Sequence, residues 1–350
     1  MSEHNELFYK YDGMSQTSAS TRNPGNSNDN LASLHNAISD ELTLFKSFYK
    51  EALKTDVFLL NQILVYLSRM KGKEIRPTLV FLAAKTSGNV TERTFVAATM
   101  IELLHTATLI HDDVVDEADR RRGLFSINKI WKNKAGVLLG DFLLSKGLLI
   151  ALDKNEFEML KIVSNAVRRM SEGELRQMKA SSLQNITRDK YFRIISEKTA
   201  SLFSACCETG AVSAGAQAEN VVKMREIGEL MGIAFQIQDD LLDYGSVDIG
   251  KPTGNDIQER KITLPLIDAL DTTDNQTKQR IKRLFSNKKK TSRDTQKIIR
   301  FVHESGGYQR AKETMNQFAE KAIHMVLDFP ESSARQSLIN TIQFVTNRSK

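Results

Sequence analysis

No proline interrupts the chain between Pro77 and Pro252, and the whole 350-residue sequence holds only 5. Because proline lacks an N–H donor and breaks the interior of a helix, this long stretch is free to be helical. From about Leu31 onward, apolar residues recur at spacings of three and four, which is the helical period. We expect helices within residues 42–53, 58–67, 94–116, 137–152, 157–173 and 225–244, and we find no convincing run of strands.

Short polar or glycine-containing breaks separate these helices. They fall at residues 71–73, 87–89, 122–123, 245–254, 287–291 and 306–307, and they divide the chain into ten or more helices. No linker-like segment follows Leu31, so the pattern predicts an all-α fold with one domain over residues 31–350. Residues 14–30 are polar and almost without large apolar side chains, so burial cannot offset the entropy cost of ordering them. We expect residues 1–30 to form a disordered tail.

The composition excludes several classes of protein. The sequence is 41% hydrophobic and 26% charged, which is typical of a soluble globular protein. Its net charge of +6 is modest, and we interpret the run Lys288–Lys290 as a solvated turn, not a nucleic-acid site. The sequence has no window of 18 or more consecutive apolar residues and no apolar core of a signal peptide. We expect a cytoplasmic protein with no membrane span and no nucleic-acid partner.

Two motifs of the form Asp-Asp-x-x-Asp lie near the ends of apolar helical segments. They are Asp112, Asp113 and Asp116, and Asp239, Asp240 and Asp243. A helix turns about 100° per residue, which predicts one shared face for His105, Thr108, Asp112, Asp116 and Asp119, and another for Gln236, Asp240 and Asp243. Like charges on packed helices cost free energy unless a cation balances them. One such motif could be a solvated helix end, but two in an apolar context favour a metal site.

The ligand chemistry of these motifs points to a magnesium ion shared with phosphate. Oxygen ligands without supporting histidine or cysteine suit hard ions, and carboxylates that hold Mg²⁺ usually share it with substrate phosphates. Arginine binds phosphate oxygens bidentately and lysine acts as a point charge. Such cations cluster in the breaks near both motifs: Lys73, Arg76, Arg120–Arg122, Lys198, Lys251 and Lys261. Each alone would be an ordinary surface residue, but together they predict a substrate with two or three phosphates.

These ordered motifs resemble those of the trans-polyprenyl (all-E isoprenyl) diphosphate synthases, most like long-chain bacterial members. The similar segments are GKEIRP (72–77), LLHTATLIHDDVVDEADRRRG (103–123), EKTA (197–200), FQIQDDLLDY (235–244) and GKPTGNDIQERKITLP (250–265). The resemblance covers almost the whole chain from about Leu31. It implies a single large helical bundle around a deep central cavity, usually a homodimer, with Mg²⁺ as the cofactor at three ions per active site.

The resemblance also implies roles for single residues. The six aspartates Asp112, Asp113, Asp116, Asp239, Asp240 and Asp243 would hold Mg²⁺ against the allylic diphosphate, and Arg121, Lys198 and Lys251 would add positive charge there. Lys73, Arg76, His105 and Arg122 would bind isopentenyl diphosphate, while Thr199 and Gln236, with Lys198, would act at the developing allylic cation. Asp256 and the substrate-binding position Lys261 match family positions near the second motif. The sequence departs from the family at Glu74, where many relatives have a basic or apolar residue, and at Arg260, where glycine is common.

The implied reaction is the head-to-tail condensation of isopentenyl diphosphate with an allylic diphosphate, either farnesyl or geranyl diphosphate. Ionisation of the allylic diphosphate leaves a cation, which the double bond of isopentenyl diphosphate attacks before a proton is lost. Metal ions and cations stabilise the departing diphosphate. No protein nucleophile is required.

Product length is predicted from the residues one helical turn before Asp112. These are Ala107 and Thr108, at family positions that often hold bulky aromatic rings in relatives with short products. Two small residues leave the passage open and favour a hexaprenyl to decaprenyl product for a quinone side chain. A geranylgeranyl or other short-chain product is the alternative. Transient contact with a membrane is a further hypothesis, since a long product is poorly soluble.

Other classes of protein fit the sequence less well. A terpene cyclase needs no isopentenyl diphosphate site, which Lys73, Arg76 and the second full motif argue against. A metal-dependent phosphohydrolase of the HD type would need another histidine well upstream of His111. The silent subunit of a heteromeric synthase typically loses motif aspartates, and this chain keeps all six. A helical protein with plain acidic stripes would leave the ordered basic loops unexplained.

Overall fold

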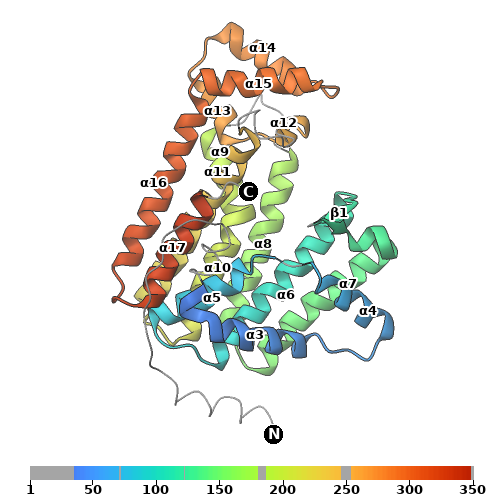
Figure 1. Cartoon of the computed structure of the whole chain (residues 1–350), viewed down its shortest axis with the longest axis vertical. Helices are drawn as coiled ribbons and strands as arrows, with labels where there is room; N and C mark the ends of the chain where they lie inside the picture. The colour runs from blue at the N-terminus through green and yellow to red at the C-terminus, as the bar shows by residue number, and fades with distance from the viewer. Residues whose placement is uncertain (1–34, 71, 122, 180–186, 246–253, 348–350) are drawn as a thin grey trace, which may run out of the picture.

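The computed structural model describes residues 35–70, 72–121, 123–179, 187–245 and 254–347, which form an all-α bundle (Figure 1). The tail predicted over residues 1–30 lies outside the described residues. In chain order the elements are η1 (Asn36–Ile38), α3 (Ser39–Ala52), α4 (Phe58–Leu67), α5 (Ile75–Ser87), α6 (Glu92–Val115), β1 (Arg120–Arg121), β2 (Leu124–Phe125), α7 (Ile127–Asp153), α8 (Phe157–Lys179), α9 (Arg188–Ile195), η2 (Ser196–Ala200), α10 (Ser201–Ser213), α11 (Ala218–Asp243), α12 (Asn255–Gln258), α13 (Leu264–Asp271), α14 (Asn275–Ser286), α15 (Ser292–Glu304), α16 (Gly307–Leu327) and α17 (Ser333–Asn347).

Helix α10 is the central helix of the bundle. It packs against α5, α6, α8 and α11, and every residue in it except Glu208 is buried. Its small residues let neighbouring backbones come close, since a Cβ on Gly210 would meet the carbonyl oxygen of Val80 on α5 at 2.4 Å. The buried thiols of Cys206 and Cys207 are free and fill the core. Helix α10 thus fixes the spacing of the helices around it.

A second apolar cluster joins α4, α6 and α7. It contains Ile63 of α4, Leu103 and Ala107 of α6, and Leu139 and Leu143 of α7, all of them buried. Burying each isoleucine or leucine side chain of this cluster stabilises the fold by roughly 1.5–3 kcal/mol. The cluster packs the middle and second half of α6 against α4 and α7, which fixes the position of the C-terminal end of α6.

The helix boundaries agree with the sequence pattern to within three residues at α3, α4 and α6. Helices α7 and α11 begin earlier than expected, and α8 ends at Lys179, six residues after the predicted end at 173. Helix α4 covers residues 58–67 as predicted, whereas α7 begins at Ile127, ten residues before the predicted start at 137. The added segment contains a kink at Lys132, with φ 71° and ψ 163°. Strands β1 and β2 have two residues each and pair antiparallel across the predicted break at 122–123. No longer strand is present in the described residues, which agrees with the expected absence of a run of strands.

Two described helices are long and apolar enough to cross a membrane by length and composition alone. In α6, 72% of the apolar window is buried inside the bundle, as expected for a core helix. In α7 only 33% is buried. One side of α7 packs on α6. This packing does not explain why the remaining, exposed side of α7 is also apolar.

Candidate active site

The first aspartate motif lies at the C-terminal end of α6. The N–H of Asp116 donates to the carbonyl oxygen of Asp112 at 2.8 Å and closes the last turn. Asp112 and Asp116 are exposed, whereas Asp113 is 4% exposed. Arg121 on β1 donates from Nε to both carboxylate oxygens of Asp113 at 2.8 Å, and its Nη2 lies 2.8 Å from Oδ1. The motif thus presents two carboxylates outward and neutralises the third with Arg121.

The face predicted for α6 is only partly correct. His105 is buried, and its carbonyl oxygen accepts the hydroxyl of Thr108 at 2.8 Å. Helix α6 ends at Val115, so Asp119 lies beyond the helix, where it pairs with Lys129 at 2.8 Å. The prediction that Asp119 belongs to this face was wrong, because helical periodicity cannot be extended past the end of the helix.

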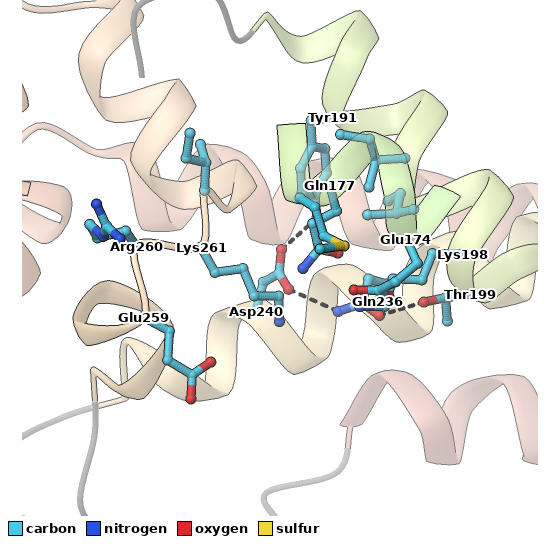
Figure 2. Close-up of a pocket in the computed structure, with 14 residues that line it drawn as sticks. Glu174, Gln177, Tyr191, Lys198, Thr199, Gln236, Asp240, Glu259, Arg260 and Lys261 are labelled. Carbon is cyan, nitrogen blue, oxygen red and sulfur yellow. Dashed lines mark hydrogen bonds and ion pairs between the residues drawn. The ribbon is translucent and has the colours of Figure 1, made fainter. Parts of the chain in front are cut away.

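The second motif lies at the end of α11 and begins a chain of hydrogen bonds (Figure 2). Asp240 is 2% exposed and accepts the hydroxyl of Tyr191 on α9 at 2.7 Å and Nε2 of Gln236 at 2.9 Å. The amide oxygen of Gln236 accepts the hydroxyl of Thr199 at 2.7 Å. Burial raises the pKa of Asp240 to about 7, against the opposing effects of Lys261 and Tyr191. These contacts confirm the predicted shared face of Gln236 and Asp240.

Asp243 caps the short helix α12. Its carboxylate accepts the backbone N–H groups of Gly254 at 3.1 Å, Asn255 at 2.9 Å and Asp256 at 3.0 Å. Burial and the nearby Asp256 raise the pKa of Asp243, and these backbone hydrogen bonds partly oppose the rise. The first aspartate of the motif, Asp239, is exposed. Each aspartate of the second motif therefore has a different environment.

Lys261 brings positive charge to the buried end of the second motif. Its Nζ lies 3.1 Å from Oδ1 of Asp256. Burial alone would lower the pKa of Lys261, but the carboxylates of Asp240 and Asp256 more than offset burial and the pKa is raised. Lys261 therefore stays protonated and stabilises the negative charge around Asp240.

Lys198 connects the surroundings of the two motifs. Its Nζ lies 2.5 Å from Oε2 of Glu174 on α8. Partial burial of the carboxyl group raises the pKa of Asp112, the carboxylate of Glu174 raises it further, and Lys198 lowers it. The acidic end of α6 therefore faces α8 and the segment that contains Lys198.

A pocket of about 220 Å³ lies where these groups meet (Figure 2). Its polar walls combine cations, carboxylates and neutral donors from α8, α9, η2, α11 and the segment after α12. The lining residues include Glu174, Gln177, Tyr191, Lys198, Thr199, Gln236, Asp240, Arg260 and Lys261. The structure thus brings together five predicted site residues, Lys198, Thr199, Gln236, Asp240 and Lys261.

Three of the four residues expected to bind isopentenyl diphosphate are described, and they lie on α5, α6 and the loop before α5. Arg76 is in the first turn of α5, which begins at Ile75. The Nζ of Lys73 lies 5.4 Å from the ring centroid of Phe344 on α17, so the C-terminal helix contributes to this region. Arg122 and Lys251 lie outside the described residues.

The two positions that depart from the family pattern both have left-handed backbone conformations. Glu74 has φ 51° and Arg260 has φ 60°. Glycine adopts this conformation without the Cβ penalty, roughly 1–2 kcal/mol, that other residues meet. The backbone therefore explains why glycine is common at the position of Arg260. Glu74 pairs with Lys46 at 3.2 Å, which anchors its side chain.

Glu174 and Tyr191 are site residues that the sequence did not reveal. Glu174 is one of several charged residues on an amphipathic helix, and nothing local distinguishes it from a solvated acid. Tyr191 is 3% exposed, so its place in the sequence pattern is also that expected of an ordinary core residue. Only the packing of α8 and α9 against α11 and η2 brings these side chains to the second motif and Lys198.

The donor set fits a hard cation that also binds an anionic ligand. Within the described residues, no three His, Cys, Asp or Glu side chains gather closely enough to hold a metal ion by themselves. The exposed carboxylates of Asp112, Asp116 and Asp239 offer only oxygen ligands. Partial desolvation raises the pKa of Asp112, and the negative charges of Glu174 and Asp116 raise it further. Such sites suit Mg²⁺ completed by phosphate oxygens.

Comparison with known proteins agrees with this geometry. The family model described as Polyprenyl synthetase matches residues 57–302. Octaprenyl diphosphate synthase of Escherichia coli is 32% identical over 92% of this chain and 100% of its own length. The crystal structure of a decaprenyl diphosphate synthase from Rhodobacter capsulatus has a TM-score of 0.86 and 32% identity, with 91% of this chain and 99% of that chain covered. A geranylgeranyl pyrophosphate synthase from Bacteroides thetaiotaomicron has a TM-score of 0.78 and 36% identity, with 91% and 100% covered.

The helical bundle with two aspartate motifs and a polar pocket at the second motif is that of an isoprenoid synthase, an all-α class of transferase. The chain belongs to the polyprenyl synthetase family. It is a prenyltransferase, and Mg²⁺ dependence is typical of this family.

Proposed function

We propose that this enzyme condenses isopentenyl diphosphate with an allylic diphosphate, farnesyl or geranyl diphosphate, to make a long-chain polyprenyl diphosphate for a quinone side chain. The observation that supports it most directly is the meeting of Lys198, Thr199 and Gln236 with Asp240 in one pocket. Long-chain products are also named for two of the relatives, and the geranylgeranyl relative keeps a short product as the alternative.

The six motif aspartates divide into two groups in this proposal. Asp112, Asp116 and Asp239 are exposed and would provide ligands to Mg²⁺, at three ions per site with the diphosphate. Asp113, Asp240 and Asp243 already bind protein groups and would position the ends of α6 and α11. Bound Mg²⁺ would neutralise charge on the departing diphosphate.

The protein side chains would then act on the two substrates. Lys198 would exchange its contact with Glu174 for the allylic diphosphate, with Arg121 and Lys251 adding charge there. The oxygens of Thr199 and Gln236, which already bond to each other at 2.7 Å, would lie beside the developing allylic cation. Preorganised groups of this kind stabilise charge without reorganisation during the reaction.

Isopentenyl diphosphate would bind near the first motif, on the side away from Lys198 and the allylic diphosphate. Its proposed partners are the cations and the histidine predicted from the sequence, namely Lys73, Arg76, His105 and Arg122. Lys73 and Arg76 flank the start of α5, and His105 lies on α6 two turns before Asp112.

The experiment that tests this proposal compares Asp112→Asn with Asp119→Asn. Both changes remove one exposed carboxylate near the end of α6, but only Asp112 is a proposed ligand. We expect Asp112→Asn to lower Mg²⁺-dependent incorporation of labelled isopentenyl diphosphate by at least about 100-fold, with Asp119→Asn within about twofold of wild type. Equal activity of the two variants would contradict the assignment.

We infer that a homodimer forms through the outer face of α7. This face exposes Val137, Leu138, Leu149 and Leu152, and the exposed Phe157 at the start of α8 follows it. Large contiguous apolar patches are rare on soluble monomers and often mark an interface. A second copy of the same helix, related by a two-fold axis, would cover the face with its own apolar residues.

Transient membrane contact is proposed at α4. Val57 precedes this helix, and Phe58, Leu59 and Val65 on it are exposed to between 50% and 76%. Insertion of such side chains into a lipid surface would bring a poorly soluble product close to its destination. The test is whether added lipid vesicles raise turnover, and no response would contradict it.

A further inference from the structure

The segment η2, Ser196–Ala200, is a five-residue π-helical turn between α9 and α10. It contains Lys198 and Thr199, both of which line the pocket. A π-turn inserts extra backbone into a helix and turns the following side chains to a new direction, and such turns occur frequently at functional sites. The π-turn is intrinsically unfavourable, so contacts from outside the segment must maintain it.

Two glycines allow neighbouring helices to reach the backbone of η2. A Cβ on Gly173 of α8 would meet the backbone nitrogen of Lys198 at 2.7 Å. A Cβ on Gly232 of α11 would meet the Cα of Ala200 at 2.5 Å. Real Cβ atoms do not tolerate such distances, so α8 and α11 approach η2 only because these positions lack side chains.

Glu197 ties η2 to two helices by ion pairs. Its carboxylate accepts Nε of Arg176 on α8 at 2.7 Å and Nε of Arg193 on α9 at 3.0 Å. The side chain of Glu197 is 13% exposed. Burial opposes ionisation, but the hydrogen bonds from Arg193 and Arg176 outweigh it and lower the pKa of Glu197. The carboxylate is therefore charged and held from two directions.

Ser196 provides a second attachment. Its hydroxyl accepts Nη2 of Arg169 on α8 at 2.9 Å and donates to Glu229 on α11. Arg169 and Glu229 also pair directly at 2.8 Å. Since Lys198 and Thr199 bind Glu174 and Gln236, each of the first four residues of η2 has a specific partner on another helix or at its own flank.

We propose that Glu197 is a positioning residue that, through Arg176 and Arg193, fixes the π-turn so that Lys198 and Thr199 face the pocket. The inference rests on the proposed function, because it assigns Glu197 to the same reaction. Glu197 does not line the pocket, so its effect passes through the backbone it anchors. Misplacing a reacting group by about 1 Å can reduce turnover by roughly 100-fold.

The test compares Glu197→Gln with the matched control Glu172→Gln. Glu172 on α8 makes an ion pair of the same kind, 2.7 Å to Arg168, within its own helix. We expect Glu197→Gln to lower kcat by about 10- to 100-fold, with KM for both substrates within about twofold of wild type and with a similar melting temperature. Glu172→Gln should keep the wild-type kcat. A wild-type kcat for folded Glu197→Gln would overturn the proposal.

Arg176→Gln tests the same link from the α8 side. The side chain of Arg176 is 42% exposed, against 13% for Glu197, so this variant should fold even if Glu197→Gln does not. We expect a smaller loss of kcat than in Glu197→Gln, and no further loss when both changes are combined, because they break the same contact. Independent, additive losses would contradict the proposal. If the wild-type enzyme itself incorporated no isopentenyl diphosphate, the proposed function would fail. That outcome is distinct from the comparison of kcat between the variants and wild type.

Discussion

At the scale of single residues, Asp268 on α13 is a buried carboxylate with few partners. It is 2% exposed and lies 3.2 Å from Nη1 of Arg188. Within the described residues neither of its oxygens has a side-chain hydrogen bond of good geometry, so the Arg188 contact is a charge pair without good alignment. Burial raises the pKa of Asp268 to about 6, although Arg188 and Arg310 oppose the rise.

This carboxyl group should make stability depend on pH. The folded protein holds the proton more tightly than the unfolded chain, whose ordinary pKa is 3.8. The stabilisation is therefore complete below about pH 4 and is lost as pH rises through 6. The difference corresponds to about 3 kcal/mol. The free energy of unfolding would be measured by denaturant at pH 4 and at pH 7. Between these two pH values, wild type should lose up to about 3 kcal/mol more of it than Asp268→Asn does. Equal losses would show that Asp268 does not titrate in this range.

The sequence identified which residue types occur at the site. It could not show which residues of one type are exposed and which are bound to other side chains. Asp112 and Asp113 are adjacent and chemically identical, yet one is exposed and the other is buried against Arg121. The difference arises from a hairpin beyond the helix, which periodicity does not describe. Likewise, the partner of Asp240 is Tyr191, and 48 residues of chain separate them. Distant partners of this kind follow only from tertiary packing.

At the scale of elements, helix α10 depends on close backbone contact at Gly210. A Cβ there would meet the carbonyl oxygen of Val80 at 2.4 Å, whereas a Cβ on Gly147 of α7 would meet only side-chain carbons of α6, the closest at 3.5 Å. We predict that Gly210→Ala destabilises the protein by about 1–3 kcal/mol through overpacking. Gly147→Ala should be neutral or stabilising by up to about 1 kcal/mol, since alanine favours a helix. Thermal unfolding of the two variants measures the difference. Equal melting temperatures would contradict this account of α10.

Long apolar helices followed directly from the sequence, and the site elements between them did not. Helix α6 differs from its predicted range by only two residues at its start and one at its end. The start of α7 was missed because residues 127–136 mix lysine and asparagine with apolar residues and include a kink at Lys132. The π-turn η2 has no local signature, because contacts with α8, α9 and α11 maintain it.

At the scale of the whole molecule, the outer face of α7 should set the oligomeric state. Leu138 on this face is 59% exposed, and Leu327 at the end of α16 is 47% exposed. We predict that Leu138→Glu converts the dimer to a monomer, because it buries an unpaired charge at the interface. Leu327→Glu, with the same chemical change elsewhere, should leave the dimer intact. Sedimentation measures both, and a wild-type monomer would contradict the proposed interface.

The fold class and the family were available from the sequence because they depend on features distributed along the whole chain. Ordered motifs from residue 72 to residue 265 predicted the bundle, and the family match over 57–302 confirms it. Product length is a different kind of property. Ala107 is 2% exposed among residues of α4, α6 and α7, and Thr108 bonds to the backbone of its own helix. How far a growing chain can extend past these two small residues is set by the packing of the surrounding helices, which the sequence does not give.

Product length is also the measurement that tests the central claim most directly. The purified enzyme would be incubated with Mg²⁺, labelled isopentenyl diphosphate and farnesyl diphosphate, and the dephosphorylated alcohols separated by chromatography. We predict a product of six or more isoprene units, formed only when Mg²⁺ is present. A geranylgeranyl product would contradict the open passage at Ala107 and Thr108 while leaving the enzyme class intact. No incorporation of isopentenyl diphosphate would contradict the proposed reaction itself.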